Sequence, residues 1–456
     1  MSGLHERLDA LRSSFSSHYV YLGLGIIFLA AKLSFVFRKE SSKALKAFSP
    51  TKATPNEKKK ERNHGEWLPV TFKYPPVNAS PQEPAELKPI PYRPFRHGQY
   101  HITMGIRPML WDEWIELDDE FEKYHHIKDY RIRTRGDRVI RVLPENPGVV
   151  GSGVNAAIET VHELSEYLAQ RFPKTFSIMR HSSASNIGWH GLPPVKSIQI
   201  EPLGVSYNLP LNVHDDKDAA VRALEIAALL VQDDLALMLE GEDGRYYFQA
   251  GAICVAGFWR LQDKIGLSLD EIHNTGNVPH YKEKLHLSME RFFRRLAVDK
   301  PVTRNNYFFQ VIKNPTSESI EEMDPDELAW AISSHGTEDD FHGSHPAEQP
   351  MRPTVTTANI RLRSERQTLR RLPRSGAILF GIRTYLTPIE KLAQETGVAR
   401  RLASSMRAWS DEVGEYKGKN GGGWWDVVMD YLDEKADEEA WRGRDEDLQK
   451  MDNYPF

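Results

Sequence analysis

Residues 361–385 read RLRSERQTLRRLPRSGAILFGIRTY and join a strongly basic stretch directly to an apolar one. The second half, residues 377–382, follows a Pro and a Gly and is an unbroken apolar run, which predicts a buried strand. Guanidinium groups so close to a core strand are expected to pair with carboxylates, backbone carbonyls or an anionic ligand. The alternative is a solvated basic face that leads into the strand. The first half holds five such groups, on Arg361, Arg363, Arg366, Arg370 and Arg371.

The composition sets the class of protein. The chain has 456 residues, of which 40% are hydrophobic and 10% aromatic, enough for two average domains or one large domain with tails. A formal net charge of −5 argues against general nucleic-acid binding, which favours a basic surface, so we expect no nucleic-acid partner. The single cysteine, Cys254, can form neither an intramolecular disulfide nor an iron–sulfur cluster. Because it lies in an apolar run, a buried thiol in a reducing compartment is the expectation.

An apolar stretch near the N-terminus predicts a membrane anchor. Residues 19–37, YVYLGLGIIFLAAKLSFVF, span about 28 Å as a helix, close to the thickness of a bilayer core. The basic residues of 38–62 predict that this side faces the cytosol. A cleaved signal peptide and a buried core helix are the competing interpretations. We therefore predict a single-pass membrane protein with a cytosolic main domain, at the endoplasmic reticulum or, alternatively, the mitochondrial outer membrane.

Composition and periodicity divide the rest of the chain. Apolar stripes of helical period at 111–124 and 156–172 accompany several strand-like runs, which predicts an α+β fold with an antiparallel sheet flanked by helices. Residues 315–352 are polar and are expected to form an insertion loop. The predicted parts are a leader (1–18), the transmembrane anchor (19–37), a basic and then Pro-rich linker (38–95), a main domain (96–400) and an acidic, Trp-containing C-terminal tail (401–456).

Four blocks of sequence stand out by their order and composition. They are MGIRPMLWDEWIELDDEF (104–121), VQDDLALML (231–239), WRLQDKIGLSLDEIH with VPHY (259–281), and SERQTLRRLP with AILFGIRTY (364–385). Together they resemble the heme-dependent oxidative N-demethylase α-subunit family, also called the HRQ family. The resemblance implies a PAS-like fold that holds heme b. It also implies that the protein oxidises a small amine or a related substrate with O₂ and external electrons. The chain carries neither a dinucleotide fingerprint nor a cysteine cluster, so a separate flavin or iron–sulfur reductase is the expected electron donor.

The resemblance assigns the heme-iron ligand to His273, which matches the histidine of the family's I-H-x-P-V-P block. In this chain two residues are added before Val278 and Pro279, and the first Pro of the block is missing. The iron geometry is therefore expected to differ from that of the family's bacterial enzymes. His280, in the same loop, is the second candidate ligand, and a structural or capping histidine is the alternative.

Carboxylates and arginines complete the predicted site. Asp233 and Asp234 match the family's V-Q-E-D block with Asp for Glu, and because adjacent residues of a strand point to opposite faces, only one can face a pocket. A carboxylate there suits the cation of an amine substrate, and pairing with an arginine of the 361–385 segment is the structural alternative. Residues 304–307 (RNNY) offer further donors to a ligand. The side chains expected to contact heme propionates are those of Arg363, Arg366 and Arg370.

The leading functional interpretation is a membrane-tethered, heme-binding oxidoreductase that resembles an oxidative N-demethylase and acts on a small molecule. The altered loop after His273 and the substitution at Asp233 favour an alternative, a non-catalytic PAS-like heme sensor. A membrane-tethered scaffold is a further alternative, because a fold does not fix a function.

Overall fold

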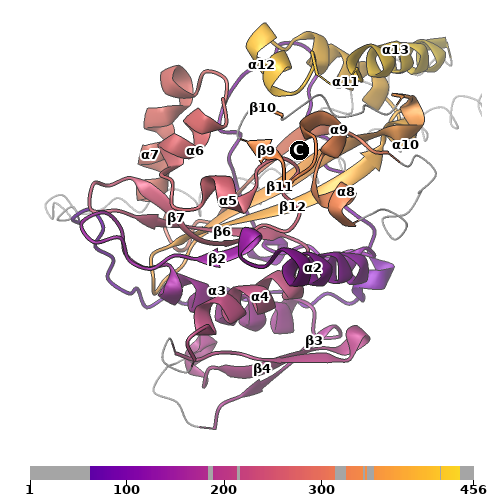
Figure 1. Cartoon of the computed structure of the whole chain (residues 1–456). Helices are drawn as coiled ribbons and strands as arrows, with labels where there is room; N and C mark the ends of the chain where they lie inside the picture. The colour runs from indigo at the N-terminus through magenta and orange to yellow at the C-terminus, as the bar shows by residue number, and fades with distance from the viewer. Residues whose placement is uncertain are drawn as a thin grey trace, which may run out of the picture. The chain divides into compact units, whose positions relative to one another are not determined.

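A seven-stranded antiparallel sheet lies at the centre of the computed structural model (Figure 1), which describes residues 62–182, 188–212, 216–313, 325–342, 345–346, 354–421 and 423–441. The strands follow the order β1-β8-β11-β12-β6-β7-β2, and each neighbouring pair is antiparallel. Their bounds are β1 (Arg107–Pro108), β2 (Ile140–Val142), β6 (Asp234–Glu240), β7 (Tyr246–Ala252), β8 (Val302–Val311), β11 (Ile360–Arg371) and β12 (Ile378–Pro388).

The segment 361–385 forms the central hairpin of this sheet. Strand β11 pairs with β12 from Arg361↔Pro388 to Arg371↔Ile378. It also pairs with β8, so it is hydrogen-bonded on both edges, and side chains on both of its faces are buried. The apolar run 377–382 is a buried strand, as predicted. The alternative interpretation, a solvated basic face, is wrong because all five arginines of residues 361–371 are buried.

Three helices cover one face of the sheet: α2 (Phe121–Arg135), α3 (Val154–Arg171) and α4 (Ala219–Leu230). Alternate strand residues such as Leu235, Leu237 and Leu379 join Leu164 and Leu224 of the helices in one hydrophobic cluster. Burial of each such side chain stabilises the fold by about 1.5–3 kcal/mol. Figure 1 shows a smaller sheet beyond the helices, made of β3 (Phe176–Arg180), β4 (Val195–Ile200) and β5 (Val205–Asn208).

The opposite face of the sheet carries shorter helices. α5 (Leu261–Lys264), α6 (Leu269–Thr275) and α7 (His286–Arg295) pack there on Ala236, Met238 and Phe248. The described residues of the predicted tail also belong to the packed structure. They form helices whose apolar side chains make up a third hydrophobic cluster, which contains Trp424 and, from the start of β11, Ile360 and Leu362. The helices of this cluster are α10 (Ile389–Leu392), α11 (Val398–Arg407), α12 (Asp411–Tyr416) and α13 (Trp425–Trp441).

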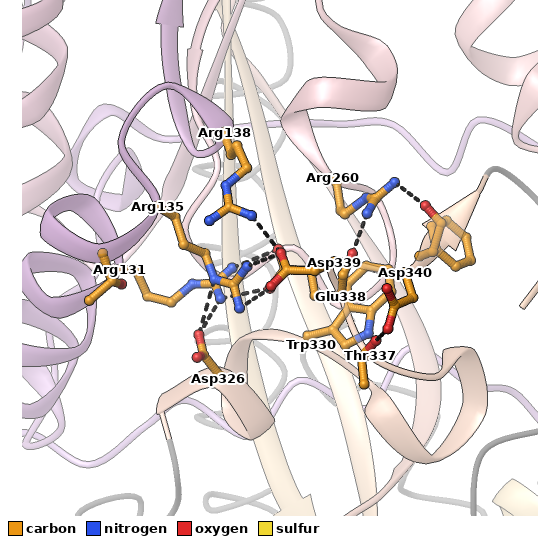
Figure 2. A network of polar contacts seen from close by, with 12 residues as sticks. Arg131, Arg135, Arg138, Arg260, Asp326, Trp330, Thr337, Glu338, Asp339 and Asp340 are labelled. Carbon is orange, nitrogen blue, oxygen red and sulfur yellow. Dashed lines mark hydrogen bonds and ion pairs between the residues drawn. The ribbon is translucent and has the colours of Figure 1, made fainter. Parts of the chain in front are cut away.

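An arginine network holds residues 325–342, the larger described part of the predicted insertion (Figure 2). Arg131 of α2 lies between Asp326, at 2.5 Å, and Glu338, at 2.7 Å. Figure 2 also shows Arg260 approaching from the other side, where it donates to the carbonyl of Phe341 at 2.6 Å. The elements held in this way are α8 (Pro325–Ala329), α9 (Ile332–His335) and β9 (Phe341–His342), which pairs with β10 (His345–Pro346).

This segment is also joined to the loop after β7 by backbone hydrogen bonds. Gly257 N–H donates to the Ala329 carbonyl at 2.7 Å, and Ala331 N–H donates to the Gly257 carbonyl at 2.9 Å. Val255 and Trp259 of the same loop line the cavity described below. The arginine network therefore supports one wall of that cavity from outside.

The mixed α+β architecture, with an antiparallel sheet and flanking helices, is confirmed. The predicted leader (1–18) and anchor (19–37) lie outside the described residues, and among the described residues no helix is both long and apolar enough to cross a bilayer. Residues 62–95, the described part of the predicted linker, run along the domain. Trp67 Nε1 donates to the Pro373 carbonyl at 3.0 Å, and Tyr74 stacks on Trp189 with ring centroids 3.7 Å apart.

Candidate functional site

A cavity of about 300 Å³ lies on the face of the sheet opposite α3 and α4. Its floor consists of alternate residues of the central strands, and α6 and α7 supply one wall. The lining is mainly apolar, with a few polar and charged side chains, which is the usual character of a ligand or cofactor site. Apolar lining residues include Met238, Phe248, Ile253, Leu269, Met289, Phe293, Leu369, Phe380 and Ile382.

His273 reaches this cavity from the last turn of α6. That short helix begins at Ser268, whose hydroxyl and Glu271 form a capping box. His273 Nδ1 lies 2.7 Å from the Leu269 carbonyl. Because a carbonyl only accepts, Nδ1 carries the proton and Nε2 carries the lone pair. Burial lowers the pKa of His273 to about 4, so the imidazole is neutral at physiological pH and suited to bind a metal.

Several polar side chains of the cavity are charged. Glu365 of β11 accepts a hydrogen bond from Gln367 Nε2 at 2.9 Å. Lys417 donates to the Tyr307 carbonyl at 2.6 Å, and burial lowers the pKa of this lysine to about 7. Arg304 of β8 and Lys264 of α5 also line the cavity. The cavity therefore offers the neutral imidazole of His273, carboxylates and several basic groups around an apolar centre.

The two adjacent aspartates lie on opposite faces of the sheet, as the strand period requires. Asp234 lines the cavity, and its oxygens accept the backbone N–H groups of Cys254 and Val255 at 2.9 Å each. Asp233 lies on the helical face, fully buried, and both of its carboxylate oxygens lack a hydrogen-bond partner among the described residues. Of the pair, only Asp234 is placed to contact a ligand in this cavity.

We expect Asp233 to make the stability of the protein depend on pH. Burial raises the pKa of this carboxyl from 3.8 to about 6, although the nearby Arg366, Arg383 and Lys128 lower it. The folded state thus holds the proton more tightly than the unfolded state, so the stabilisation is present below pH 4 and is lost as the pH rises through about 6. Relative to wild type, the free energy of unfolding of Asp233→Asn should rise by about 2–3 kcal/mol between pH 4 and 7. Urea unfolding at both pH values tests this, and parallel pH profiles would refute it.

The arginines predicted to hold propionates do not line the cavity. Arg363 donates to the Val255 carbonyl and, at 3.2 Å, to Thr384 Oγ1. Arg366 and Arg370 lie on the helical face, where they pair with Glu116 (3.0 Å) and with Glu163 of α3, respectively. Their partners are thus mainly carboxylates and backbone carbonyls of the protein itself, which the sequence analysis gave as the alternatives to an anionic ligand.

The second candidate ligand, His280, lies in a different place from His273. It lines an outer cavity of about 490 Å³ together with Lys284 and Trp409. Its Nε2 is 3.4 Å from a carboxylate oxygen of Glu412, and its backbone adopts a left-handed conformation with φ of 52°. The structure therefore brings His273 and Asp234 to one cavity and places His280 outside it.

An extended segment, residues 99–106, contributes to the lining of the cavity, and we call it the roof segment. Its backbone from 99 to 104 makes no hydrogen bond to any described residue. Gly98 (φ 90°) and Gly105 (φ 62°) stand at its ends in a conformation that glycine adopts readily. The roof segment is thus held mainly by its side chains. Tyr100, Ile102, Met104 and Ile106 are half-buried and line the cavity, and the more exposed His101 and Thr103 also contribute to its lining.

Amide exchange should identify the roof segment as a mobile part of the domain. Without hydrogen bonds, the amides of residues 99–104 are expected to exchange near the rate of an unfolded peptide, and to slow when a ligand fills the cavity. Hydrogen–deuterium exchange with mass spectrometry measures this, with the amides of β12 as the protected reference. Strong protection of residues 99–104 in the ligand-free protein would contradict the description of the roof segment.

Glu365, Lys264, Lys417 and the roof segment were not predicted as parts of the site. A signal for two of these was present in the sequence. Apolar side chains alternate from Tyr100 to Ile106, and a strand of alternating type places Glu365 on the same face as Leu369. No comparable signal marks Lys417, which reaches the cavity from the residue directly after α12, more than a hundred residues after β8. Cys254 is buried, as expected.

A family model described as haem-dependent oxidative N-demethylase, alpha subunit-like, matches residues 105–429 of the chain. The matched region contains all seven strands of the central sheet and the helices from α2 to α12. It also contains His273, Asp234 and the other lining residues of the cavity, apart from the first residues of the roof segment.

Proposed function

The chain belongs to the haem-dependent oxidative N-demethylase alpha-subunit-like family, and we propose that it is a heme-binding oxidoreductase whose cavity holds heme b. The observation that carries the proposal is the placement of His273. It lines an apolar cavity as a neutral imidazole whose Nδ1 is fixed by the Leu269 carbonyl. A ring nitrogen oriented by a hydrogen bond on the other nitrogen is the usual state of a metal-binding histidine.

The chemistry of the lining residues fits heme. A porphyrin ring requires apolar walls, which Met238, Phe248 and Phe380 supply. Its propionates require cations, which Arg304 and Lys417 supply. When bound, the heme supplies O₂ activation and one-electron chemistry. The protein would contribute the iron ligand, the apolar surroundings and the groups that orient the substrate.

Asp234 is the residue that we propose to recognise an amine substrate. Its carboxylate lines the cavity and is held by two backbone N–H groups, so its position is fixed before any ligand enters. A small amine is a cation at neutral pH and would pair with this carboxylate. Asp233, on the helical face, has no access to the same ligand.

Electron supply and membrane attachment are further parts of the proposal. The chain has one cysteine, so an iron–sulfur cluster would have to belong to a partner, and a separate flavin or iron–sulfur reductase is the proposed donor. The apolar residues 19–37, followed by basic residues, support a single anchor with the main domain in the cytosol, at the endoplasmic reticulum or the mitochondrial outer membrane. Such an anchor would keep the two proteins on one membrane.

A PAS-like heme sensor without turnover is the second candidate function. It is favoured by the loop after His273, in which Asn277 and His280 both adopt positive φ and two residues are added relative to the family's block. Oxygen consumption separates the two functions. With a reductase and a panel of secondary and tertiary methylamines, the enzyme should consume O₂ and release formaldehyde in proportion. Tight heme binding with no amine-dependent oxygen uptake would contradict the oxidoreductase and favour the heme sensor.

A further inference from the structure

Arg304 differs from the other arginines on the central strands because none of the described residues accepts a hydrogen bond from it. It lies on β8, opposite Gln367 in the register with β11, and its side chain lines the cavity. It donates no hydrogen bond to any described residue, and its Nε is buried without a partner. The residue as a whole is half-buried. Burying part of a guanidinium without an acceptor is costly, so such a group is expected where a ligand supplies the acceptor.

The charges around Arg304 point to an anion. The carboxylate that interacts electrostatically with Arg304 is that of Glu365, and among the described residues no hydrogen bond joins the two. Glu365 is already engaged, since it accepts from Gln367 and lies 3.5 Å from Arg363 Nε. Lys417 adds another cation close to Glu365 and Arg304. This end of the cavity is therefore lined by two basic side chains, Arg304 and Lys417, and one carboxylate, Glu365.

We propose that Arg304 is the carboxylate-binding residue of the cavity, with Lys417 as the second cation. The proposal rests on the proposed function in one respect only, since a heme propionate is one source of the carboxylate. The other source is a substrate that carries its own carboxylate, such as an N-methylated amino acid. Arg304 thus takes the role for which the sequence suggested Arg363, Arg366 and Arg370.

The test compares the full-length wild type with Arg304→Gln and with a control, Arg141→Gln, which changes an exposed arginine on β2 of the same sheet. Each protein is titrated with hemin and with hemin dimethyl ester, in which both propionates are neutral. If the carboxylate is a propionate, Arg304→Gln should bind hemin about 10–100-fold more weakly and the ester unchanged, and Arg141→Gln should match wild type. Arg304→Lys, which keeps the charge, should recover part of the loss.

If the carboxylate belongs to a substrate, hemin affinity should be the same in all proteins. N-methylglycine, but not dimethylamine, should then change the Soret band of wild type and have no effect on Arg304→Gln. Either pattern supports the carboxylate site and identifies the source. A variant with unchanged responses to hemin, the ester and N-methylglycine overturns the proposal.

Two measurements on the ligand-free protein do not depend on heme. Benzoate should raise the melting temperature of wild type more than benzamide does, and this difference should vanish in Arg304→Gln. That result would support the site even if no heme were bound, so its outcome is separate from that of the proposed function. Without ligand, Arg304→Gln should melt no lower than wild type, because the substitution removes an unpaired charge. Marked destabilisation would assign Arg304 a structural role instead.

Discussion

Arg370→Met is expected to lower the free energy of unfolding by about 3–5 kcal/mol, as when one partner of a buried ion pair is removed. Arg370 is fully buried on the helical face of the sheet. Its guanidinium pairs with Glu163 of α3 and lies over the rings of Trp111 (4.8 Å) and Trp114 (4.4 Å). The variant leaves the Glu163 carboxylate buried without its cation, and the methionine restores only the apolar contacts.

Urea unfolding measures this loss, and hemin titration of the folded variant distinguishes a structural arginine from a propionate ligand. Arg370 does not line the cavity, so the folded variant should bind hemin with wild-type affinity. Arg141→Met, at an exposed position of β2, is the matched control and should change stability by less than about 0.5 kcal/mol. A stable Arg370→Met protein with weakened hemin binding would restore the role that the sequence suggested for this residue.

His273→Ala is expected to lower hemin affinity by at least about 100-fold, because it removes the proposed iron ligand itself rather than a group that orients one. The cavity should otherwise survive because, within the part of the chain that the structure describes, the side chain hydrogen-bonds only to the Leu269 carbonyl of its own helix. Added imidazole should fill the space and recover much of the Soret band. The absorption spectrum of the reconstituted variant, with and without imidazole, checks both statements.

His280→Ala is the matched control for that experiment. It removes a histidine seven residues further along the chain, which lines the outer cavity rather than the inner one. Its spectrum should match that of wild type. If His280→Ala lost the band and His273→Ala kept it, the iron ligand would be His280 and the heme would lie outside the inner cavity.

The sequence was informative where apolar composition or the period of a strand determines the local structure. The run 377–382 is a strand because apolar side chains dominate it, and the adjacent aspartates 233 and 234 separate to opposite faces because strands have a period of two. Strand β11 was harder to recognise. It is central and buried on both faces, so its arginines occupy both sides and no alternation marks it as a strand.

The partners of these arginines could not be predicted, because they come from distant parts of the chain. Glu163 is 207 residues before Arg370, and Asp118, which pairs with Arg383 at 2.8 Å, is 265 residues before it. Only packing of α3 and of the segment before α2 onto the sheet brings them together. The same holds for Arg304, whose lack of an acceptor is a property of the folded cavity and not of the motif RNNY.

The central claim is that the cavity beside His273 holds heme, and an absorption titration of the full-length protein with hemin tests it most directly. We expect a Soret band distinct from that of free hemin, saturation at one heme per chain, a shift on reduction, and loss of the band in His273→Ala. A well-folded protein that leaves the spectrum of hemin unchanged from buffer would contradict the claim.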